Sequence, residues 1–402
     1  MKVKVKKSPV VIPGFRFAGV ACGLKPSGKK DLALLVSDVP ATAVAAFTTN
    51  RVKAAPVLLG EERLKAGRLQ AIVVNSGNAN ASTARPGLKL AQDTCTLVGR
   101  ELRIAPGLVL PSSTGVIGVL PKWKNMQTGI RDAAAALSVR GFWNALAGIM
   151  TTDAFPKAAL RQVSVGGRTV TIAGMAKGAG MINPNMATLL CYVCTDAVLS
   201  RSALQRILDQ SLPDSFNAIS VDGDTSTNDT VVLLANGLAG NREITAQGKD
   251  YTTVREATHD VLCDLARMCV KDGEGASKVV DVFVRGAKDD ADAEKVARTV
   301  ACSPLVKTAF FGGDPNWGRI ACAVGYAGAR VDQTRLAIFV GEVPIGQKGM
   351  STGARNEKRA ARVMQQPEFS IAIDLGLGRG TAHVVTSDLS TAYVHFNSAY
   401  TT

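Results

Sequence analysis

The amino-acid sequence predicts an α+β or layered α/β protein. Short apolar runs alternate with stretches of helical periodicity along the whole chain of 402 residues. Hydrophobic residues make up 46% of the chain and charged residues 20%, a balance typical of a globular protein that can bury a core. A chain of this length forms two or three domains, or one large core with an appendage.

The predicted strands are short apolar runs bounded by glycine or other turn residues, and the predicted helices are longer periodic stretches. The strands cover residues 32–36, 71–75, 169–173, 188–194, 230–235, 280–285, 336–340, 369–374 and 382–386. The helices cover residues 88–102, 126–134, 140–150, 201–209, 251–270, 291–302 and 357–364. Within 251–270, Val254, Val261, Leu265 and Met268 recur at near-helical spacing, which predicts a face turned toward a core.

The chain carries a formal net charge of +14. A basic protein can bind nucleic acid or attract small anions. The Lys and Arg residues are dispersed and aromatic residues make up only 5% of the chain, which disfavours nucleic acid as a partner. The charge instead favours attraction of carboxylate substrates.

No apolar run of 18 or more residues occurs, so we expect no membrane span. The N-terminal sequence MKVKVKKSPVVIPG is basic, but it lacks the long apolar segment of a signal peptide and the Arg- and Ser-rich pattern of a transit peptide. We therefore expect a cytoplasmic protein.

Histidine and cysteine offer no metal site or histidine-based triad. The three histidines, His259, His383 and His395, are far apart and lack ligand spacing. Cys191 and Cys194 form a CxxC pattern, but it lies in the apolar run LLCYVC without a second pair, so we interpret it as part of a core strand. The eight cysteines are expected to be free thiols. If the protein is an enzyme, its base is not expected to be histidine.

Many glycines cluster in loops such as NSGNAN, SSTGVIG, AKGAGM and DGEGAS. Glycine allows positive φ angles and close approach of the backbone, so these loops predict a site built partly from backbone amides. None of them matches the phosphate-binding GxxxxGK[ST] loop or a GxGxxG turn between strand and helix. A nucleotide-binding enzyme is therefore disfavoured.

The segment KGAGMINPNMAT, residues 177–188, precedes the apolar run LLCYVC. One interpretation is a glycine loop that leads into a strand, with Thr188 an ordinary β-branched residue. The other is an N-terminal nucleophile: cleavage between Ala187 and Thr188 would give Thr188 a free α-amine with a pKa of about 7.7–8.0. That amine can accept the proton of the threonine's own hydroxyl, which would replace a histidine base.

This segment resembles the cleavage motif of the ornithine acetyltransferases, also called glutamate N-acetyltransferases. Further blocks resemble the family in the same order: GFRFAGVACGLKPSGKKDLALLVSD, FTTNRVKAAPV, NSGNANAST, PSSTGVIG, MTTDAFPK, SVDGDTSTNDT, KDGEGASK, GGDPNWGRI and AYVHFNSAYTT. The resemblance runs from about residue 14 to the last residue. So many motifs in one order favour the nucleophile interpretation of Thr188.

The resemblance implies roles for particular residues. Thr188 would be the nucleophile, and Thr114 with the backbone N–H of Gly115 would form the oxyanion hole. Cleavage would separate Ala187 from Thr188. Substrate contacts would come from Thr151, Lys177, Thr188, Glu274, Asn397 and Thr402. The substrate N²-acetylornithine carries a carboxylate and an amine, for which a lysine and a glutamate are suitable partners.

The resemblance also implies a layered αββα sandwich of the self-processing N-terminal-nucleophile type, with a smaller C-terminal α/β portion at about residues 286–402. The α chain would be residues 1–187 and the β chain residues 188–402, and two such αβ units would form a dimer, a heterotetramer of four chains. The expected reaction moves an acetyl group from N²-acetylornithine to L-glutamate by a ping-pong mechanism through acetyl-Thr188. No metal or bound cofactor is expected. Some family members also use acetyl-CoA, and no residue of the sequence decides this.

Three alternatives stay open at this stage. An aminopeptidase or amidase would share the chemistry but use water as acceptor, and a binding protein could keep the fold without catalysis. The segment DGDTST at 222–227 is also similar to the DxDxT motif of aspartyl-phosphate phosphatases, although those place it near the start of the fold. The sequence assigns no role to the loop from Asp222 to Asp229 or to Asp314, Asn316 and Arg319.

Overall fold

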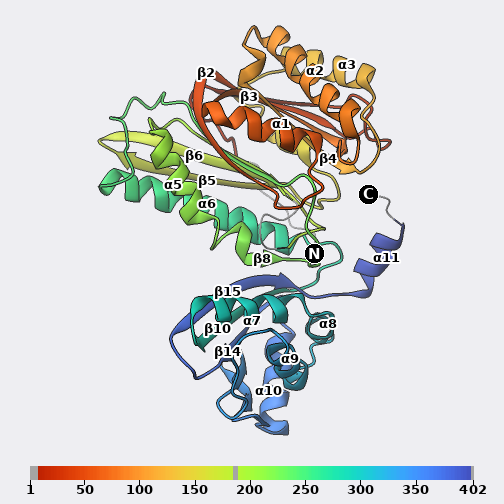
Figure 1. The fold of residues 1–402 in the computed structure, drawn as a ribbon, viewed down its shortest axis with the longest axis vertical. Helices are drawn as coiled ribbons and strands as arrows, with labels where there is room; N and C mark the ends of the chain where they lie inside the picture. The colour runs from red at the N-terminus through yellow and green to blue at the C-terminus, as the bar shows by residue number, and fades with distance from the viewer. Residues whose placement is uncertain (1–7, 184–188, 400–402) are drawn as a thin grey trace.

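The computed structural model describes residues 8–183 and 189–399. They form a large core unit and a smaller C-terminal unit, one above the other in Figure 1. The core unit contains one sheet in the order β4-β3-β2-β9-β7-β6-β5, with β1 paired to β2. Its strands are β1 (Phe15–Val20), β2 (Leu32–Phe47), β3 (Arg68–Asn78), β4 (Val109–Val116), β5 (Lys157–Val165), β6 (Arg168–Lys177), β7 (Leu190–Thr195) and β9 (Thr230–Ala235).

Strand β2 divides the core sheet into two halves. Its first part pairs with β1 and β3, its last part pairs with β9, and its register shifts between Val36 and Ala41. Irregularities of this kind bend a strand. Side chains of both halves, such as Ile72 of β3 and Tyr192 of β7, meet in one buried cluster. The bent sheet therefore packs against itself as a sandwich.

Helices cover both outer faces of this sandwich (Figure 1). On one side, α1 (Ala55–Arg63), α2 (Ala84–Leu102) and α3 (Trp123–Ala135) contact the half made of β1 to β4. On the other, α6 (Lys249–Lys271) contacts β5 and β6, and α5 (Arg201–Ser211) contacts β9 and the last part of β2. Helix α4 (Phe142–Ile149) packs between the halves. The layers are helix, sheet, sheet, helix, which confirms the predicted αββα sandwich.

The C-terminal unit is a second mixed sheet with helices. Its strand order is β13-β12-β11-β14-β10-β15-β8. The strands are β8 (Ile219–Ser220), β10 (Val279–Ala287), β11 (Ala337–Val340), β12 (Val343–Gln347), β13 (Met350–Ser351), β14 (Glu368–Asp374) and β15 (Gly380–Ser387). The helices of this unit are α7 (Asp290–Cys302), α8 (Pro304–Gly312), α9 (Trp317–Gly325) and α10 (Ala354–Met364). Outside it, short 3-10 turns lie at Leu64–Ala66, Pro106–Leu108 and Phe216–Ala218.

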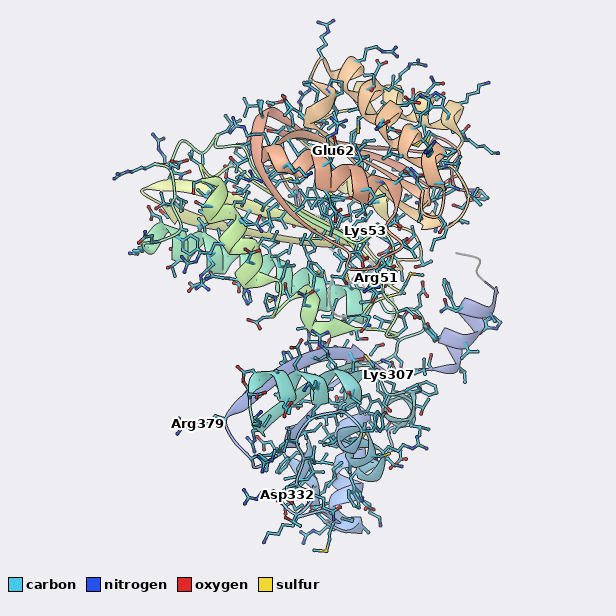
Figure 2. All side chains as sticks on the ribbon, in the orientation of Figure 1. Arg51, Lys53, Glu62, Lys307, Asp332 and Arg379 are labelled. Atoms are coloured by element: carbon cyan, nitrogen blue, oxygen red, sulfur yellow. The ribbon has the colours of Figure 1, made fainter. Side chains whose placement is uncertain are left out.

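One strand links the two units. Strand β8 belongs in sequence to the core but pairs in parallel with the end of β15. Close to this boundary lies Lys307 of α8 (Figure 2), whose buried ammonium group donates to the Thr386 hydroxyl at 2.9 Å and to Ser387. Helix α11 (Thr391–Ala399) then stands away from both sheets in Figure 1, and none of its residues is fully buried.

The predicted helices and strands all appear, except that the start of the predicted strand 188–194 lies outside the described residues. The cysteines of that strand are buried on opposite faces of β7, and all eight cysteines of the chain are free. The sequence analysis missed β4 because Pro111, Ser112, Ser113 and Gly115 are typical of loops; here they pair in parallel with β3. Among the described helices, none combines the length and apolarity needed to cross a membrane.

Candidate active site

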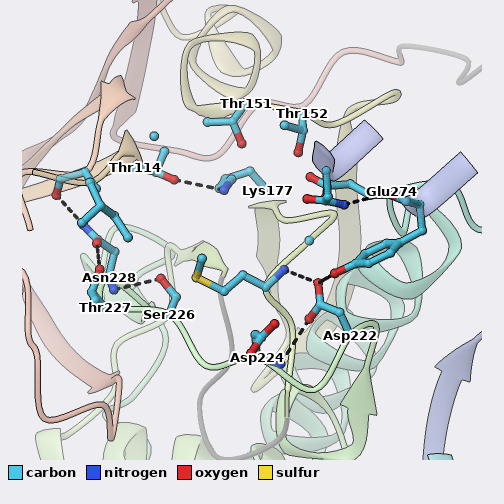
Figure 3. Close-up of a pocket in the computed structure, with 17 residues that line it drawn as sticks. Thr114, Thr151, Thr152, Lys177, Asp222, Asp224, Ser226, Thr227, Asn228 and Glu274 are labelled. Carbon is cyan, nitrogen blue, oxygen red and sulfur yellow. Dashed lines mark hydrogen bonds between the residues drawn. The ribbon is translucent and has the colours of Figure 1, made fainter. Parts of the chain in front are cut away.

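Strand ends from both halves of the core sheet meet around a cavity of about 250 Å³ (Figure 3). Strand β4 contributes Thr114 and Gly115, and β6 ends at Lys177. The described lining also includes Ala79, Ile117, Thr151, Thr152, Gly180, Met181, Asp222, Asp224, Ser226, Thr227, Asn228, Glu274, Tyr393 and Asn397.

The cavity brings together the predicted site residues Thr114, Gly115, Thr151, Lys177, Glu274 and Asn397, which span 284 positions of the chain. Three other predicted residues, Ala187, Thr188 and Thr402, lie outside the described residues.

Thr114 and Lys177 are in direct contact. The Lys177 Nζ donates a hydrogen bond to the Thr114 Oγ1 at 3.1 Å, and both residues are buried. Burial lowers the pKa of the Lys177 ammonium group, although Asp153 opposes that shift. The hydroxyl of Thr114 is therefore held beside the buried amine of Lys177, which in its protonated form would favour negative charge developing close by.

Gly115 occupies a place where only glycine fits. Its φ angle is +121°, and a Cβ atom there would lie 2.5 Å from the carbonyl carbon of Gly77 on β3. A side chain would push β4 away from β3 at the cavity wall. The SSTG sequence is thus matched to a close parallel pairing of two strands that ends at the cavity.

A buried ion cluster lies behind the wall formed by Thr151 and Lys177. The Lys157 Nζ lies 2.6 Å from the Asp153 Oδ1 and 2.5 Å from the Asp272 Oδ2. Burial opposes ionisation of Asp153, but the nearby Lys157 and Lys177 outweigh it and hold the pKa of this carboxyl below its usual range. Burial likewise disfavours the charged form of Lys157, and Asp153 more than compensates, so the pKa of Lys157 is raised.

Asp222 fixes the backbone just before the segment 184–188. Its two carboxylate oxygens accept hydrogen bonds from the Met181 N–H at 2.6 Å and the Ile182 N–H at 2.7 Å. Burial raises the pKa of Asp222 to about 6, against the opposing effect of these hydrogen bonds. Asp222, the first aspartate of the phosphatase-like segment, therefore acts here as a hydrogen-bond acceptor for backbone amides.

Asp229 contacts the backbone just after the same segment. It is fully buried, and its Oδ1 accepts the N–H of Leu189 at 2.9 Å. Within the described part of the chain its Oδ2 accepts no hydrogen bond. Burial raises the pKa of this carboxyl well above its usual range. The loop from Asp222 to Asp229 thus holds the chain on both sides of residues 184–188.

Glu274 closes the cavity on the side of the C-terminal unit. Its backbone N–H donates to the Ala179 carbonyl at 2.7 Å, and a Cβ atom on Gly180 would lie 2.4 Å from its carboxylate. Asn397 of α11 donates to the Glu274 Oε2 at 3.1 Å. The exposed helix α11 therefore reaches back to the site through a side chain that the sequence analysis had selected.

Two sets of residues lie outside the cavity lining. None of the three histidines, all of which the structure describes, is part of that lining. Asn316 caps α9 by accepting the Arg319 N–H at 3.1 Å, and Asp314 accepts from the Asn316 side chain. No three or more His, Cys, Asp or Glu side chains are grouped to hold a metal ion among residues 8–183 and 189–399.

Sequence reasoning left Asp153, Asp222 and Asp229 without a role. Each lies in a block that the analysis had quoted, MTTDAFPK or SVDGDTSTNDT. The available signal was an aspartate in a run of small polar residues, and only Asp229 lies directly beside a predicted strand. That signal could not show which distant backbone amides these carboxylates would accept.

Comparisons with known proteins identify the family of this chain. The model of the ArgJ family matches residues 16–402. An arginine biosynthesis bifunctional protein ArgJ from Geobacter sulfurreducens is 48% identical over 391 residues, which cover 97% of this chain and 100% of that protein. The protein of the same name from Syntrophotalea carbinolica is 49% identical over 396 residues, which cover 98% and 100%.

A crystal structure of arginine biosynthesis bifunctional protein ArgJ from Bacillus halodurans is also similar. It aligns with a TM-score of 0.50 at 40% identity and covers 52% of this chain and 98% of its own. The family model, the full-length relatives and the solved structure all point to the same family, so the resemblance found in the motifs is confirmed. The chain belongs to the ArgJ family.

Proposed function

We propose that this chain is an acetyltransferase of arginine biosynthesis that cleaves itself between Ala187 and Thr188. It then moves the acetyl group of N²-acetylornithine to L-glutamate. The observation that carries the proposal is the cavity itself. It gathers six of the residues implied by the family resemblance, while Asp222 and Asp229 hold the chain on either side of residues 184–188.

The lengths of the relatives support cleavage. The two bacterial proteins are covered over their whole length by this chain. The Bacillus halodurans chain is covered over 98% of its length yet spans only 52% of this one, so it is about half as long. A chain of that length is what cleavage near the middle would produce, and residue 188 lies near the middle.

In the proposed cleavage, the Thr188 Oγ attacks the Ala187 carbonyl carbon and the peptide C–N bond breaks. The threonine nitrogen takes up the hydroxyl proton and becomes an amine, and the α chain is left as an ester on the oxygen. Water hydrolyses the ester, which gives the Ala187 carboxylate and restores the Thr188 hydroxyl. The new α-amine then serves as the base for its own hydroxyl.

Acetyl transfer repeats the same steps on a substrate. The Thr188 Oγ attacks the acetyl carbonyl of N²-acetylornithine, Thr114 and the Gly115 N–H stabilise the oxyanion, and ornithine leaves with the proton held by the amine. In the second half-reaction the amine of glutamate attacks the carbonyl carbon of the acetyl ester, the ester C–O bond breaks, N-acetylglutamate leaves, and the Thr188 oxygen takes up the proton that the attacking amine gives up. Nucleophile and base both belong to Thr188, so the mechanism needs neither a metal nor a bound cofactor. If the protein also acetylates glutamate directly, acetyl-CoA would be the acetyl donor for that reaction.

The charged groups of the cavity are suited to the proposed substrates. Lys177 is the partner for a carboxylate and Glu274 is the partner for an ammonium group. Both line the cavity together with Thr151 and with Asn397 of α11. Thr402 remains a proposed contact. A dimer of αβ units, implied by the family resemblance, and the cytoplasmic location expected above also remain part of the proposal.

The test is a pair of substitutions at the nucleophile. Thr188→Ala is expected to remain a single uncut chain without transferase activity, while Thr188→Ser keeps a hydroxyl and is expected to cleave and to retain activity. Mass spectrometry reports cleavage, and transfer of labelled acetyl from N²-acetylornithine to glutamate reports activity. Transferase activity in Thr188→Ala would overturn the proposal, and release of acetate without any transfer to glutamate would favour an amidase.

A further inference from the structure

The ion cluster of Asp153, Lys157 and Asp272 is buried directly behind the cavity wall. The three side chains are at most 2% exposed. Charges that are withdrawn from water are costly unless they are paired and fully hydrogen-bonded. Such a cluster beside a site therefore calls for a reason beyond stability.

Asp153 connects the segments that carry the site residues. Its Oδ2 accepts the Thr151 N–H at 2.8 Å, and its Oδ1 accepts the Gly178 N–H at 2.8 Å, directly after Lys177. Asp272 accepts the Ala154 N–H at 3.0 Å and lies two residues before Glu274. One cluster thus sets the backbone positions of three cavity segments.

The charge of Lys177 also depends on this cluster. Lys177 is buried, its hydrogen bond goes to the neutral hydroxyl of Thr114, and no carboxylate of the described residues lies within 4.0 Å of its Nζ. The charged and titratable groups that act on it are Asp153, Lys157, Asp229, Cys269 and Lys25.

Among these groups, Asp153 is the one that supplies a lasting negative charge. Burial raises the pKa of Cys269 to about 12 and raises that of Asp229 well above its usual range, which favours their neutral forms. Lys157 is cationic, and Lys25 is cationic below its pKa, which burial lowers to about 8, so both disfavour a further positive charge. The pKa of Asp153 lies below its usual range, so Asp153 stays ionised and opposes the effect of burial on the ammonium form of Lys177.

We propose that Asp153 is a positioning residue: it holds Lys177 in its ammonium form and directs it into the cavity, and so makes the site selective for substrates that carry a carboxylate. This inference rests on the proposed function. It assigns to the aspartate of the MTTDAFPK block a role in substrate selection that acts through Lys177.

The experiment compares Asp153→Asn with Asp272→Asn. Both remove one buried carboxylate in contact with Lys157, but only Asp153 also accepts the N–H of Gly178, directly after Lys177. The KM for N²-acetylornithine and kcat are measured from pH 6 to pH 9. For Asp153→Asn we expect KM to rise at least about tenfold at pH 8 and to recover as the pH falls and Lys177 regains its proton, with kcat much less affected. Asp272→Asn should keep the wild-type dependence of KM on pH.

A third variant guards against general destabilisation. Asp153→Asn combined with Lys157→Gln removes one charge of each sign, so the repulsion on Lys177 also falls. We expect KM at pH 8 to be lower in this double variant than in Asp153→Asn, although still above the wild-type value. A purely structural role of Asp153 would not produce this decrease. The inference is overturned if Asp153→Asn and Asp272→Asn give the same KM–pH profile, or if the double variant is no better than Asp153→Asn.

A binding measurement separates this inference from the proposed function. Calorimetry with L-ornithine, run in two buffers of different ionisation enthalpy, reports binding and proton uptake without catalysis. A wild-type chain that neither binds ornithine nor transfers acetyl would overturn the proposed function, and the inference with it. A wild-type chain that does both, beside an Asp153→Asn variant that binds ornithine without extra proton uptake at pH 8, would overturn the inference alone.

Discussion

Two polar motifs of this chain look alike in sequence and differ in the structure. The loop from Asp222 to Asp229 and the segment from Asp314 to Arg319 both combine aspartate, asparagine and glycine between regular elements. In the first, the carboxylates of Asp222 and Asp229 accept hydrogen bonds from backbone amides in a distant part of the chain, at Met181, Ile182 and Leu189. In the second, the side-chain hydrogen bonds remain local.

The second motif builds a helix end. Asn316 accepts the N–H of Arg319 three residues later, Asp314 accepts from Asn316, and the Arg319 guanidinium donates to the Leu305 carbonyl of the neighbouring helix. Capping of this kind stabilises a helix. The comparison teaches that residue types alone do not separate a site from a cap. Burial of the carboxylates and the sequence distance to their partners separate them here.

The largest expected effect comes from the wall of the cavity. Gly115→Ala places a Cβ atom 2.5 Å from Gly77, so β4 must move and the oxyanion donors with it. We expect acetyl transfer to fall on the order of 100- to 1,000-fold, the loss typical for one oxyanion donor. The matched control is Gly118→Ala in the same block, where φ is +81° but no atom lies within 4 Å of the added Cβ.

Initial rates of acetyl transfer, with thermal unfolding as a check on folding, distinguish the two glycine variants. Equal losses of activity in both would mean that backbone strain alone explains the result, and that the close approach of β4 to β3 has no special part in catalysis.

A smaller effect is expected when the hold on the cleavage segment is weakened. Asp222→Asn replaces one of the two acceptor oxygens by a donor, so the Met181 or Ile182 amide loses a charged partner. Losing a hydrogen bond to a charged group costs about 1.5–3 kcal/mol, which corresponds to a slowing of roughly 10- to 150-fold. The rate of self-cleavage after synthesis, followed by gel densitometry, measures it. Asp224→Asn in the same loop is the control, and we expect it to cleave at the wild-type rate.

The same residue predicts a pH dependence of stability. The pKa of Asp222 rises on folding from 3.8 to about 6 because of burial, so the folded chain binds this proton more tightly than the unfolded chain. Its contribution to stability is fully present below pH 3.8 and is lost as the pH rises through 6. Denaturant titrations between pH 4 and pH 7 should show a smaller decrease in Asp222→Asn than in wild type. An unchanged decrease would mean that Asp222 is not the group that titrates.

The smallest effect belongs to the second motif. Asn316→Ala removes the side-chain cap of α9 and is expected to cost about 1 kcal/mol of unfolding free energy, with acetyl transfer unchanged. Asn316→Ser, which keeps a capping oxygen, should restore most of that stability. A loss of activity without a loss of stability in Asn316→Ala would contradict the assignment of this motif to folding.

The sequence predicted the regular elements well and the bends poorly. Helix α6 and strand β7 follow from periodicity and from an apolar run, because their side chains pack against one core. The turn of β2 between Val36 and Ala41 could not be predicted, since a register shift depends on the partner strands. Strand β4 was missed because its Pro, Ser and Gly residues favour loops, and the pairing with β3 outweighs that preference.

For the site, the motifs identified residues that reach the cavity, but their physical partners were beyond prediction. Nothing in the sequence relates Asp153 to Gly178, or Asp222 to Met181, because each hydrogen bond joins segments that only the fold brings together. The proposed substrate contacts at Thr151, Lys177, Glu274 and Asn397 came from the family resemblance. All four residues line the same cavity.

The measurement that tests the central claim most directly is denaturing mass spectrometry of the purified 42.0 kDa chain. The proposed cleavage predicts two fragments: a smaller one of about 20 kDa, from 187 of the 402 residues, and a larger one whose first residue is Thr188. A single intact chain that transfers acetyl from N²-acetylornithine to glutamate would contradict it, because Thr188 would then act without a free α-amine.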